Sequence, residues 1–116
     1  MYNTILHHCL VSKEAYWVNL DPTIGTEIQK TRPAIVISNN IQNKISSRVI
    51  IIPITSNINN IFPFEVRVTV NNKIAKALTD QIRTIDKSRL GEFIEQLNKT
   101  EIINIEKAIK VTLSLT

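Results

Sequence analysis

Strict alternation of apolar and polar side chains over residues 64–70 constrains the fold more than any other feature of this chain. Every even position in the segment is Phe or Val, and every odd position is Glu, Arg or Thr. Because successive side chains of a strand point to opposite faces, this pattern predicts a half-buried β-strand with one face in water. The pair Asn71-Asn72 that follows predicts a turn, since asparagine tolerates a left-handed backbone.

Other short runs rich in Val and Ile predict further strands, because they are too short for stable helices. They cover residues 15–20, 34–38 and 48–54, and a more polar strand is expected at 77–84. Residues 90–97 fit either a strand or a helical turn. No repeat or linker interrupts this series, so the 116 residues are expected to contain one domain.

The last segment changes period and predicts an amphipathic helix. Asn98 and Glu101 stand three residues apart, as in a capping box at a helix start. Apolar side chains then recur at helical spacing on one face, at Ile102, Ile105, Ile109 and Leu113. Several short strands followed by one terminal helix predict a mostly β fold, a small and mainly antiparallel barrel with the helix docked on its sheet.

Composition narrows the function classes without choosing one. The formal charge of +4 and the pI near 9.4 fit either a solvated, lysine-biased surface or a polyanionic partner such as nucleic acid. Cys9 is the only cysteine, which excludes an intrachain disulfide and fits a reducing compartment. No apolar run approaches the ~20 residues of a membrane span, and the N-terminus lacks the pattern of a signal peptide, so a cytoplasmic protein is expected.

The amino-terminal segment contains the metal-like sequence His7-His8-Cys9. Adjacent residues do not converge easily on one ion, and nothing in the sequence places a base beside Cys9. Terminal segments of this kind are often poorly ordered. We therefore expect residues 1–12 to be a poorly ordered extension of a domain covering 13–116, with neither a metal site nor a cofactor.

Residues 21–33 predict a shaped loop between two strands, because they contain one of the two glycines and two of the four prolines. Arg32 precedes Pro33, which favours an extended backbone. A guanidinium held at a strand entrance suits a phosphate group, because it donates several planar hydrogen bonds. The simpler interpretation is structural, with Asp21 capping a turn and Glu27 paired with Arg32 at the surface.

Two further places offer polar side chains to a ligand. Thr55 and Ser56 end the third Val- and Ile-rich run, where hydroxyls most often satisfy a turn. Gln81 and Arg83 share one face of the expected polar strand. Alternation then gives one face of that strand to the core and leaves the other for a ligand.

Taken in order along the chain, these segments resemble the MazF/PemK family of toxin endoribonucleases. The resemblance spans roughly residues 13–115. The matching motifs are Tyr16-Trp17-Val18-Asn19-Leu20-Asp21-Pro22, Gly25-Thr26-Glu27, Lys30-Thr31-Arg32-Pro33-Ala34, Pro53-Ile54-Thr55-Ser56, Phe62-Pro63-Phe64-Glu65-Val66 and residues 80–90 (DQIRTIDKSRL). The chain departs from the family pattern at Lys13, where a glycine usually precedes the acidic residue of the first strand.

The resemblance implies a small SH3-like antiparallel barrel of the MazF/CcdB toxin type with a C-terminal helix, assembled as a homodimer. It implies metal-independent cleavage of single-stranded RNA at short motifs, leaving 2′,3′-cyclic phosphate and 5′-hydroxyl ends. The family's catalytic arginine and threonine correspond to Arg32 and Thr55, and an important loop glutamate corresponds to Glu27. The expected partner is an antitoxin whose disordered tail blocks the RNA groove.

RNA would need contacts beyond the scissile phosphate. Lys30 and Ser56 are candidates for binding its backbone, and Gln81 and Arg83 for reading base edges. Exposed apolar side chains are candidates for packing on splayed bases, and this set is drawn from Ile24, Ile28, Tyr16 and Phe62.

Two other functions stay open on the sequence. One is a toxin that binds a protein, as CcdB toxins bind gyrase, although this chain ends Leu113-Ser114-Leu115-Thr116 and lacks their terminal Trp-Gly-Ile. The other is an RNA-binding barrel without catalysis, against which the presence of both Arg32 and Thr55 argues. The proton carrier is also open among Arg32, Glu27 and water, because arginine gives up its proton poorly.

Overall fold

The structure is a computed structural model that describes residues 12–28 and 30–115. Within these residues, antiparallel strands form one curled sheet in the order β4-β5-β3-β2-β1-β7, with β6 paired to β3. The strands are β1 (Glu14–Asn19), β2 (Thr31–Val36), β3 (Arg48–Thr55), β4 (Val66–Val70), β5 (Lys73–Ala77), β6 (Arg83–Asp86) and β7 (Leu90–Gln96). The helices are α1 (Asn40–Ile45) and α2 (Lys99–Leu113), with short 3-10 turns η2 (Thr79–Gln81) and η3 (Lys87–Arg89).

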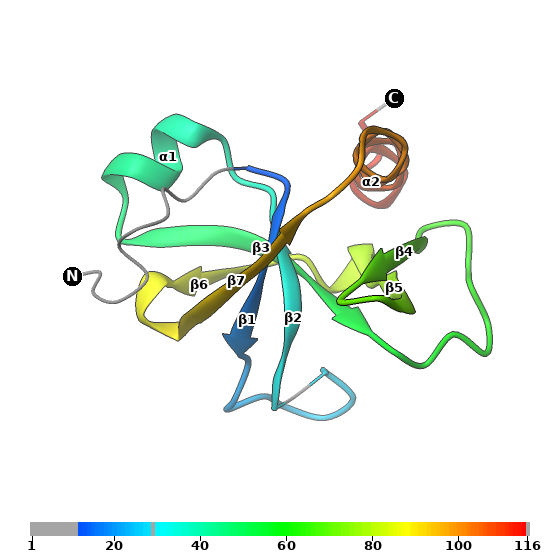
Figure 1. Cartoon of the computed structure of the whole chain (residues 1–116), viewed down its shortest axis with the longest axis horizontal. Helices are drawn as coiled ribbons and strands as arrows, with labels where there is room; N and C mark the ends of the chain where they lie inside the picture. The colour runs from blue at the N-terminus through cyan, green and yellow to red at the C-terminus, as the bar shows by residue number, and fades with distance from the viewer. Residues whose placement is uncertain (1–11, 29, 116) are drawn as a thin grey trace.

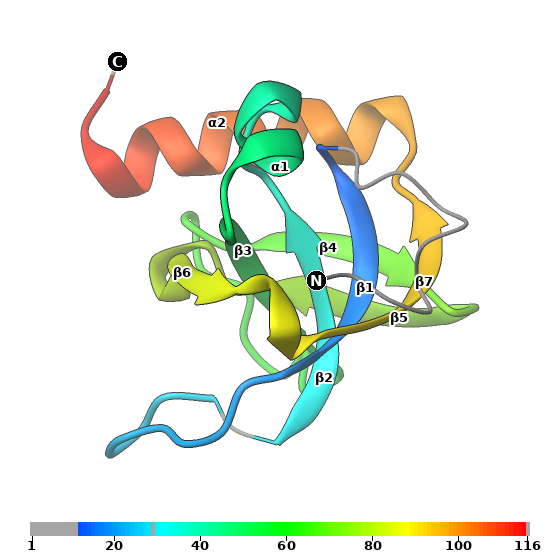
Figure 2. The same ribbon diagram turned by 90° about the vertical axis from the view of Figure 1, so that its left-hand side faces the viewer.

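The predicted fold class is confirmed. The sheet curls into a half-barrel, and both helices lie at its upper end in Figures 1 and 2, with α1 set apart from α2. The three Val- and Ile-rich runs form β1, β2 and β3, and the ambiguous segment 90–97 forms β7. β4 begins at Val66, two residues later than the alternation predicted, and it buries its valines while Arg67 and Thr69 stay exposed.

One predicted strand is wrong. Residues 77–84 do not run as a single strand, because β5 ends at Ala77, η2 turns the chain and β6 begins at Arg83. The physical reason lies in β3, whose first half pairs with β6 while its last two residues pair with β5 along the same edge. The chain must leave one ladder before it enters the other, and the side-chain pattern does not mark that break.

The predicted turn at Asn71-Asn72 is confirmed, but the sequence analysis missed the two elements β5 and α1. β5 is joined to β4 through Asn71 and Asn72, whose φ angles of 57° and 61° are left-handed, as predicted for this turn. The sequence analysis identified neither β5 nor α1. α1 is short, and its start is capped by the side chain of Asn39, which accepts a hydrogen bond from the backbone N–H of Gln42.

The central strands face two separate apolar cores, one on each side of the sheet. Neighbours in β2 divide between them, since Ala34 faces one core and Ile35 the other. The core beneath α2 contains Ala15, Ile35, Ile52, Ile54, Val66, Val68, Val70, Ala75, Ala77, Leu97, Ile105 and Ala108. The second core contains Tyr16, Val18, Leu20, Ala34, Val36, Val49, Ile51, Ile85 and Leu90. Burial on both faces explains why these strands read as continuous apolar runs.

The predicted capping box at the start of α2 is confirmed. The side chain of Asn98 accepts a hydrogen bond from the backbone N–H of Glu101 (2.8 Å), and the Glu101 carboxylate accepts one from the backbone N–H of Asn98 (3.2 Å). The helix buries Ile105 and Ala108 against the sheet. Leu113, predicted on the buried face, lies in the last turn and is exposed.

Replacing Asn98 with alanine is expected to destabilise the fold by about 1 kcal/mol, because it leaves a backbone N–H of the first turn without its acceptor. Chemical denaturation measures this loss. Asn104→Ala is the matched control, since Asn104 is exposed in the middle of the same helix and alanine is the better helix former there. Equal destabilisation by both substitutions would contradict the role of the cap.

Several expectations concern the amino-terminal end. The interpretation of His7-His8-Cys9, and the expectation of a poorly ordered segment up to residue 11, lie outside the described residues. The departure at Lys13 coincides with a left-handed backbone, φ 72°, which glycine adopts without steric cost. Of the helices in the described ranges, none is long and apolar enough to cross a membrane.

Candidate functional site

The sheet face that carries the second core becomes polar at one end. In the β1–β2 ladder Val18 pairs with Arg32, and in the β2–β3 ladder Ala34 pairs with Pro53. The β2–β3 ladder ends at this pair, and Arg32 and Thr55 each lie two residues beyond it, on the same face of their strands as Ala34 and Pro53. Directly opposed residues of antiparallel strands point to the same face, so these two side chains share one face at the mouth of the loop.

Two further cations join this face. Thr55 pairs with Lys76 of β5, and Ile51 pairs with Arg83 of β6, so both cations point to the side of Thr55. The structure therefore brings together Arg32, Thr55 and Arg83, which the sequence singled out, and adds Lys76, which it did not. The sequence analysis missed Lys76 because it did not identify β5, the strand in which Lys76 lies.

Arg32 is extended within β2, as the following proline predicted, and it is half-buried. Thr55 is the last residue of β3, and its hydroxyl oxygen accepts a hydrogen bond from the backbone N–H of Asn57 (3.2 Å). The turn interpretation of this hydroxyl is thus confirmed. The bond uses an oxygen lone pair, so the hydroxyl proton can still be donated to a ligand. Ser56 follows at the surface.

The tip of the loop is shaped by Glu27. Its carboxylate accepts a hydrogen bond from the backbone N–H of Ile24 (2.6 Å), and its own N–H donates to the carbonyl of Ile24 (3.2 Å). Gly25 lies inside this turn with φ 62°, which requires a left-handed backbone. In the ranges that the structure describes, Glu27 and Arg32 form no ion pair, so the surface-pair interpretation is wrong.

The base of the loop is held to the sheet by polar contacts. Asp21 accepts a hydrogen bond from the backbone N–H of Lys30 (3.0 Å), so it closes the base of the loop and does not cap a local turn in the predicted way. Arg83 donates to the carbonyl of Leu20 (3.3 Å). The side-chain oxygen of Gln81 accepts a hydrogen bond from the backbone N–H of Ile28 (2.9 Å). Gln81 and Arg83, predicted to read bases, therefore also position the loop.

A third tether was not predicted. The Arg89 guanidinium donates to the carbonyls of Asn19 (3.2 Å) and Asp21. Arg89 lies in η3, whose start is capped by Asp86 through a hydrogen bond from the N–H of Ser88 (2.8 Å). That hydrogen bond lowers the pKa of the Asp86 carboxyl. No spacing in the sequence indicates this contact, because η3 and the loop are far apart along the chain.

The apolar candidates separate by exposure. Tyr16 is only 1% exposed, in the second core, so it is not one of the exposed side chains that can pack on a base. Its hydroxyl donates to Glu14 (3.1 Å). Ile28 packs partly against the second core, while Ile24 at the loop tip is 83% exposed. Phe62 is also exposed and stays a candidate.

The sequence of the chain matches a known family model over most of its length. The family model described as PemK-like, MazF-like toxin of type II toxin–antitoxin systems covers residues 13–113. The chain belongs to this toxin family. A relative, endoribonuclease MazF9 of Mycobacterium tuberculosis, is 33% identical over 111 residues, covering 88% of this chain and 94% of its own.

Solved structures share the fold of this MazF-like toxin. MazF of Deinococcus radiodurans matches with a TM-score of 0.83 at 24% identity, over 93% of this chain and 99% of its own. A mycobacterial endoribonuclease in complex with its cognate antitoxin matches with a TM-score of 0.78 at 19% identity, over 92% and 97% of the two chains. At these identities the likeness establishes the fold.

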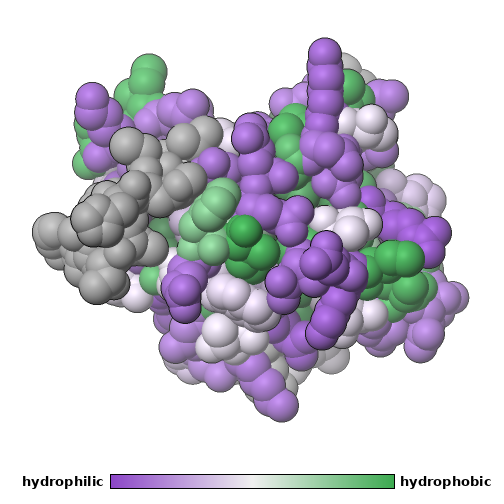
Figure 3. Space-filling view, viewed as in Figure 1, coloured by the Kyte–Doolittle hydropathy of each residue, from purple (hydrophilic) through white to green (hydrophobic). Residues whose placement is uncertain are grey.

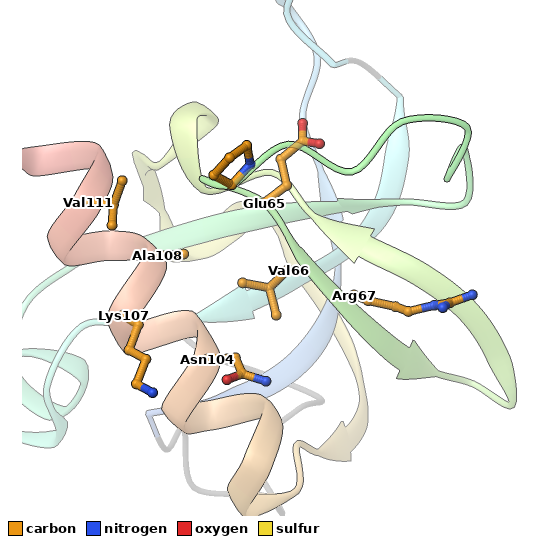
Figure 4. Close-up of a pocket in the computed structure, with 8 residues that line it drawn as sticks. Glu65, Val66, Arg67, Asn104, Lys107, Ala108 and Val111 are labelled. Carbon is orange, nitrogen blue, oxygen red and sulfur yellow. The ribbon is translucent and has the colours of Figure 1, made fainter.

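The toxin has a hollow outside the polar array. A groove of about 330 Å³ lies between β4 and α2 (Figure 4), lined by Pro63, Glu65, Val66, Arg67, Asn104, Lys107, Ala108 and Val111. None of the predicted catalytic or RNA-binding residues lines it. Among the described residues, no cluster of three His, Cys, Asp or Glu side chains is placed to hold a metal ion. Metal independence stays a prediction that an assay must test.

Proposed function

We propose that this MazF-like toxin cleaves single-stranded RNA by attack of a ribose 2′-hydroxyl on the adjacent phosphorus. The new 2′-O–P bond forms as the P–O5′ bond breaks, which yields 2′,3′-cyclic phosphate and 5′-hydroxyl ends. The proposal is supported by the strand register, in which Arg32 and Thr55 lie on one sheet face, each two residues beyond the Ala34–Pro53 pair. The names of relatives such as endoribonuclease MazF9 support it.

In this proposal Arg32 and Thr55 clamp the scissile phosphate. The guanidinium stabilises the negative charge that develops on the phosphorane, and the Thr55 hydroxyl donates to a non-bridging oxygen. The Glu27 carboxylate is the base that we assign to the 2′-hydroxyl proton, since one of its oxygens is held by Ile24 and the other can accept a proton. Water supplies the proton that the departing 5′-oxygen takes up.

Other residues of the loop face are proposed to bind the rest of the RNA. Lys30 and Ser56 are both exposed, near Arg32 and Thr55 along the chain, and in this proposal they contact the phosphate backbone. Ile28 offers an apolar surface beside them. Gln81 and Arg83 hold the loop through hydrogen bonds to its backbone. We propose that they also contact base edges.

The assembly that we propose is a homodimer inhibited by an antitoxin in the cytoplasm. Solved relatives in complex with a cognate antitoxin support the antitoxin partner. The basic charge of the chain fits both RNA and an acidic antitoxin tail. Light scattering of the purified chain tests the dimer, and a mass equal to the 13.2 kDa of one chain would contradict it.

End mapping of a long RNA incubated with the protein in EDTA tests the function. We expect cuts at one short motif, each with a 2′,3′-cyclic phosphate on one side and a 5′-hydroxyl on the other. Cleavage that requires added metal would contradict the mechanism. RNA binding without any cut would support a non-catalytic barrel, and neither binding nor cutting would favour a toxin that acts on a protein.

Thr55→Val tests the hydroxyl with little change of shape. We expect kcat to fall by roughly 100-fold, because a single donor to the phosphorane is lost while the strand is preserved. Single-turnover cleavage of the mapped RNA motif measures the change. Thr69→Val on exposed β4 is the control and should cleave at the wild-type rate. Unchanged kcat in Thr55→Val would remove Thr55 from the clamp.

A further inference from the structure

The loop between β3 and β4 presents apolar side chains that neither core uses. Phe62 is 50% exposed and stacks on Phe64, with ring centroids 5.6 Å apart and an angle of 3° between the rings. The preceding Ile61 is 41% exposed. On the face shown in Figure 3, a small patch of hydrophobic residues lies among hydrophilic ones at the right. An exposed aromatic ring held flat against another is a suitable surface for a planar ligand.

A nearly buried ion pair fixes this ring in place. The Lys76 ammonium donates to the Glu65 carboxylate (3.0 Å) and to the carbonyl of Asn60 (2.6 Å). The same Glu65 oxygen accepts a hydrogen bond from the backbone N–H of Phe62 (3.0 Å). The ammonium also lies 5.9 Å from the centroid of the Phe62 ring. The middle of the loop, at Asn60, and its end, at Glu65, are therefore both tied to one lysine.

The cost of this arrangement indicates a function. The Lys76 and Glu65 side chains are only 10% and 6% exposed, and burying charges is unfavourable even when they are paired. Replacing such a pair with apolar residues of similar volume is often neutral or stabilising. The ion pair instead fixes the position of the Phe62 ring relative to β5.

That position is next to the proposed clamp. Lys76 is the β5 partner of Thr55 and points to the same face. Phe62, above Lys76, therefore stands beside the residue that would hold the scissile phosphate.

We infer that Phe62 is a stacking platform for the base adjacent to the scissile phosphate, and that the Lys76–Glu65 pair positions it. The inference rests on the proposed ribonuclease function. It adds a residue that positions the bound RNA by stacking on one of its bases. Stacking needs only a π-face, so the platform favours bases by stacking strength and leaves hydrogen-bond readout to other groups. It acts on substrate binding and leaves the chemical step unchanged.

A fluorescent base tests the platform directly. The probe is an oligonucleotide that spans the mapped cut, carries deoxyribose in place of the attacking ribose, and has 2-aminopurine at one position at a time. We expect wild-type protein to quench one position next to the cut. Phe62→Ala should abolish that quenching and weaken binding roughly tenfold, whereas Ile61→Ala should change neither.

The outcomes separate this inference from the proposed function. If wild-type protein makes no cut, the proposed function fails at the mapping step. If cutting is normal but the 2-aminopurine signal is the same in Phe62→Ala and wild type, the platform alone is contradicted. Quenching that is lost equally in Ile61→Ala would also overturn it, since the whole loop and not the ring would then be responsible.

The positioning pair needs its own variants, because Lys76→Met alone leaves a nearly buried carboxylate unpaired. The double variant Glu65→Gln with Lys76→Met removes both charges together. We expect it to raise KM several-fold with kcat within about twofold of wild type, and Lys76→Arg to restore KM. A purely structural role would lower the melting temperature without this separation of KM from kcat, and that result would contradict the positioning role.

Discussion

Arg32→Ala is expected to reduce RNA cleavage about 100- to 1,000-fold in kcat. Arg32 enters β2 on the face of Thr55, where its guanidinium meets the charge that develops on the phosphorane. That charge is larger in the transition state than in bound RNA, so the loss should fall mainly on kcat and less on KM. Single-turnover cleavage at saturating protein measures it.

Two companion variants make the result specific. Arg32→Lys keeps the charge but not the planar pair of donors, and it should recover only part of the activity. Arg48→Ala removes an exposed arginine at the start of β3, on the opposite sheet face, and should cleave as wild type does. Wild-type cleavage by Arg32→Ala would refute the clamp. Loss of activity in Arg48→Ala as well would point to a general effect of net charge.

The elements that were predicted correctly are those whose signal lies in neighbouring residues. Alternation marked the buried valines of β4, and the Asn98–Glu101 spacing marked the start of α2. The break between β5 and β6 escaped prediction because it depends on β3 pairing with two different strands along one edge. Such a choice of partners is a property of the assembled sheet and leaves no trace in the local pattern.

The candidate site shows the same division. Pro33 correctly predicted the extended backbone of Arg32. The end of an apolar run indicated Thr55 as a candidate. Lys76 and Arg89 were not found, because each reaches the site from a distant part of the chain. The exposure of a side chain could not be predicted from the sequence either. Tyr16 was a candidate for RNA contact, but it is buried in the second core.

Ile105→Ala is expected to have the largest effect on stability, about 2–5 kcal/mol. Ile105 is fully buried where α2 meets the sheet, so truncation loses apolar burial and leaves a cavity. A domain of this size is stabilised by only about 5–15 kcal/mol, so the change removes a large share of the total. Chemical denaturation measures the free energy of unfolding.

Ile103→Ala is the matched control, because Ile103 lies on the same helix with 42% of its surface exposed, and the loss there should stay within about 0.5 kcal/mol. The pair also tests how the fold and the site are connected. Ile105 packs in the same core as Ile54, the residue before Thr55. The Thr55 side chain points to the other face of the sheet, away from this core. Below its lowered melting temperature, Ile105→Ala should therefore cleave with nearly normal KM and kcat. A selective loss of kcat in the folded variant would show that α2 packing sets the position of Thr55.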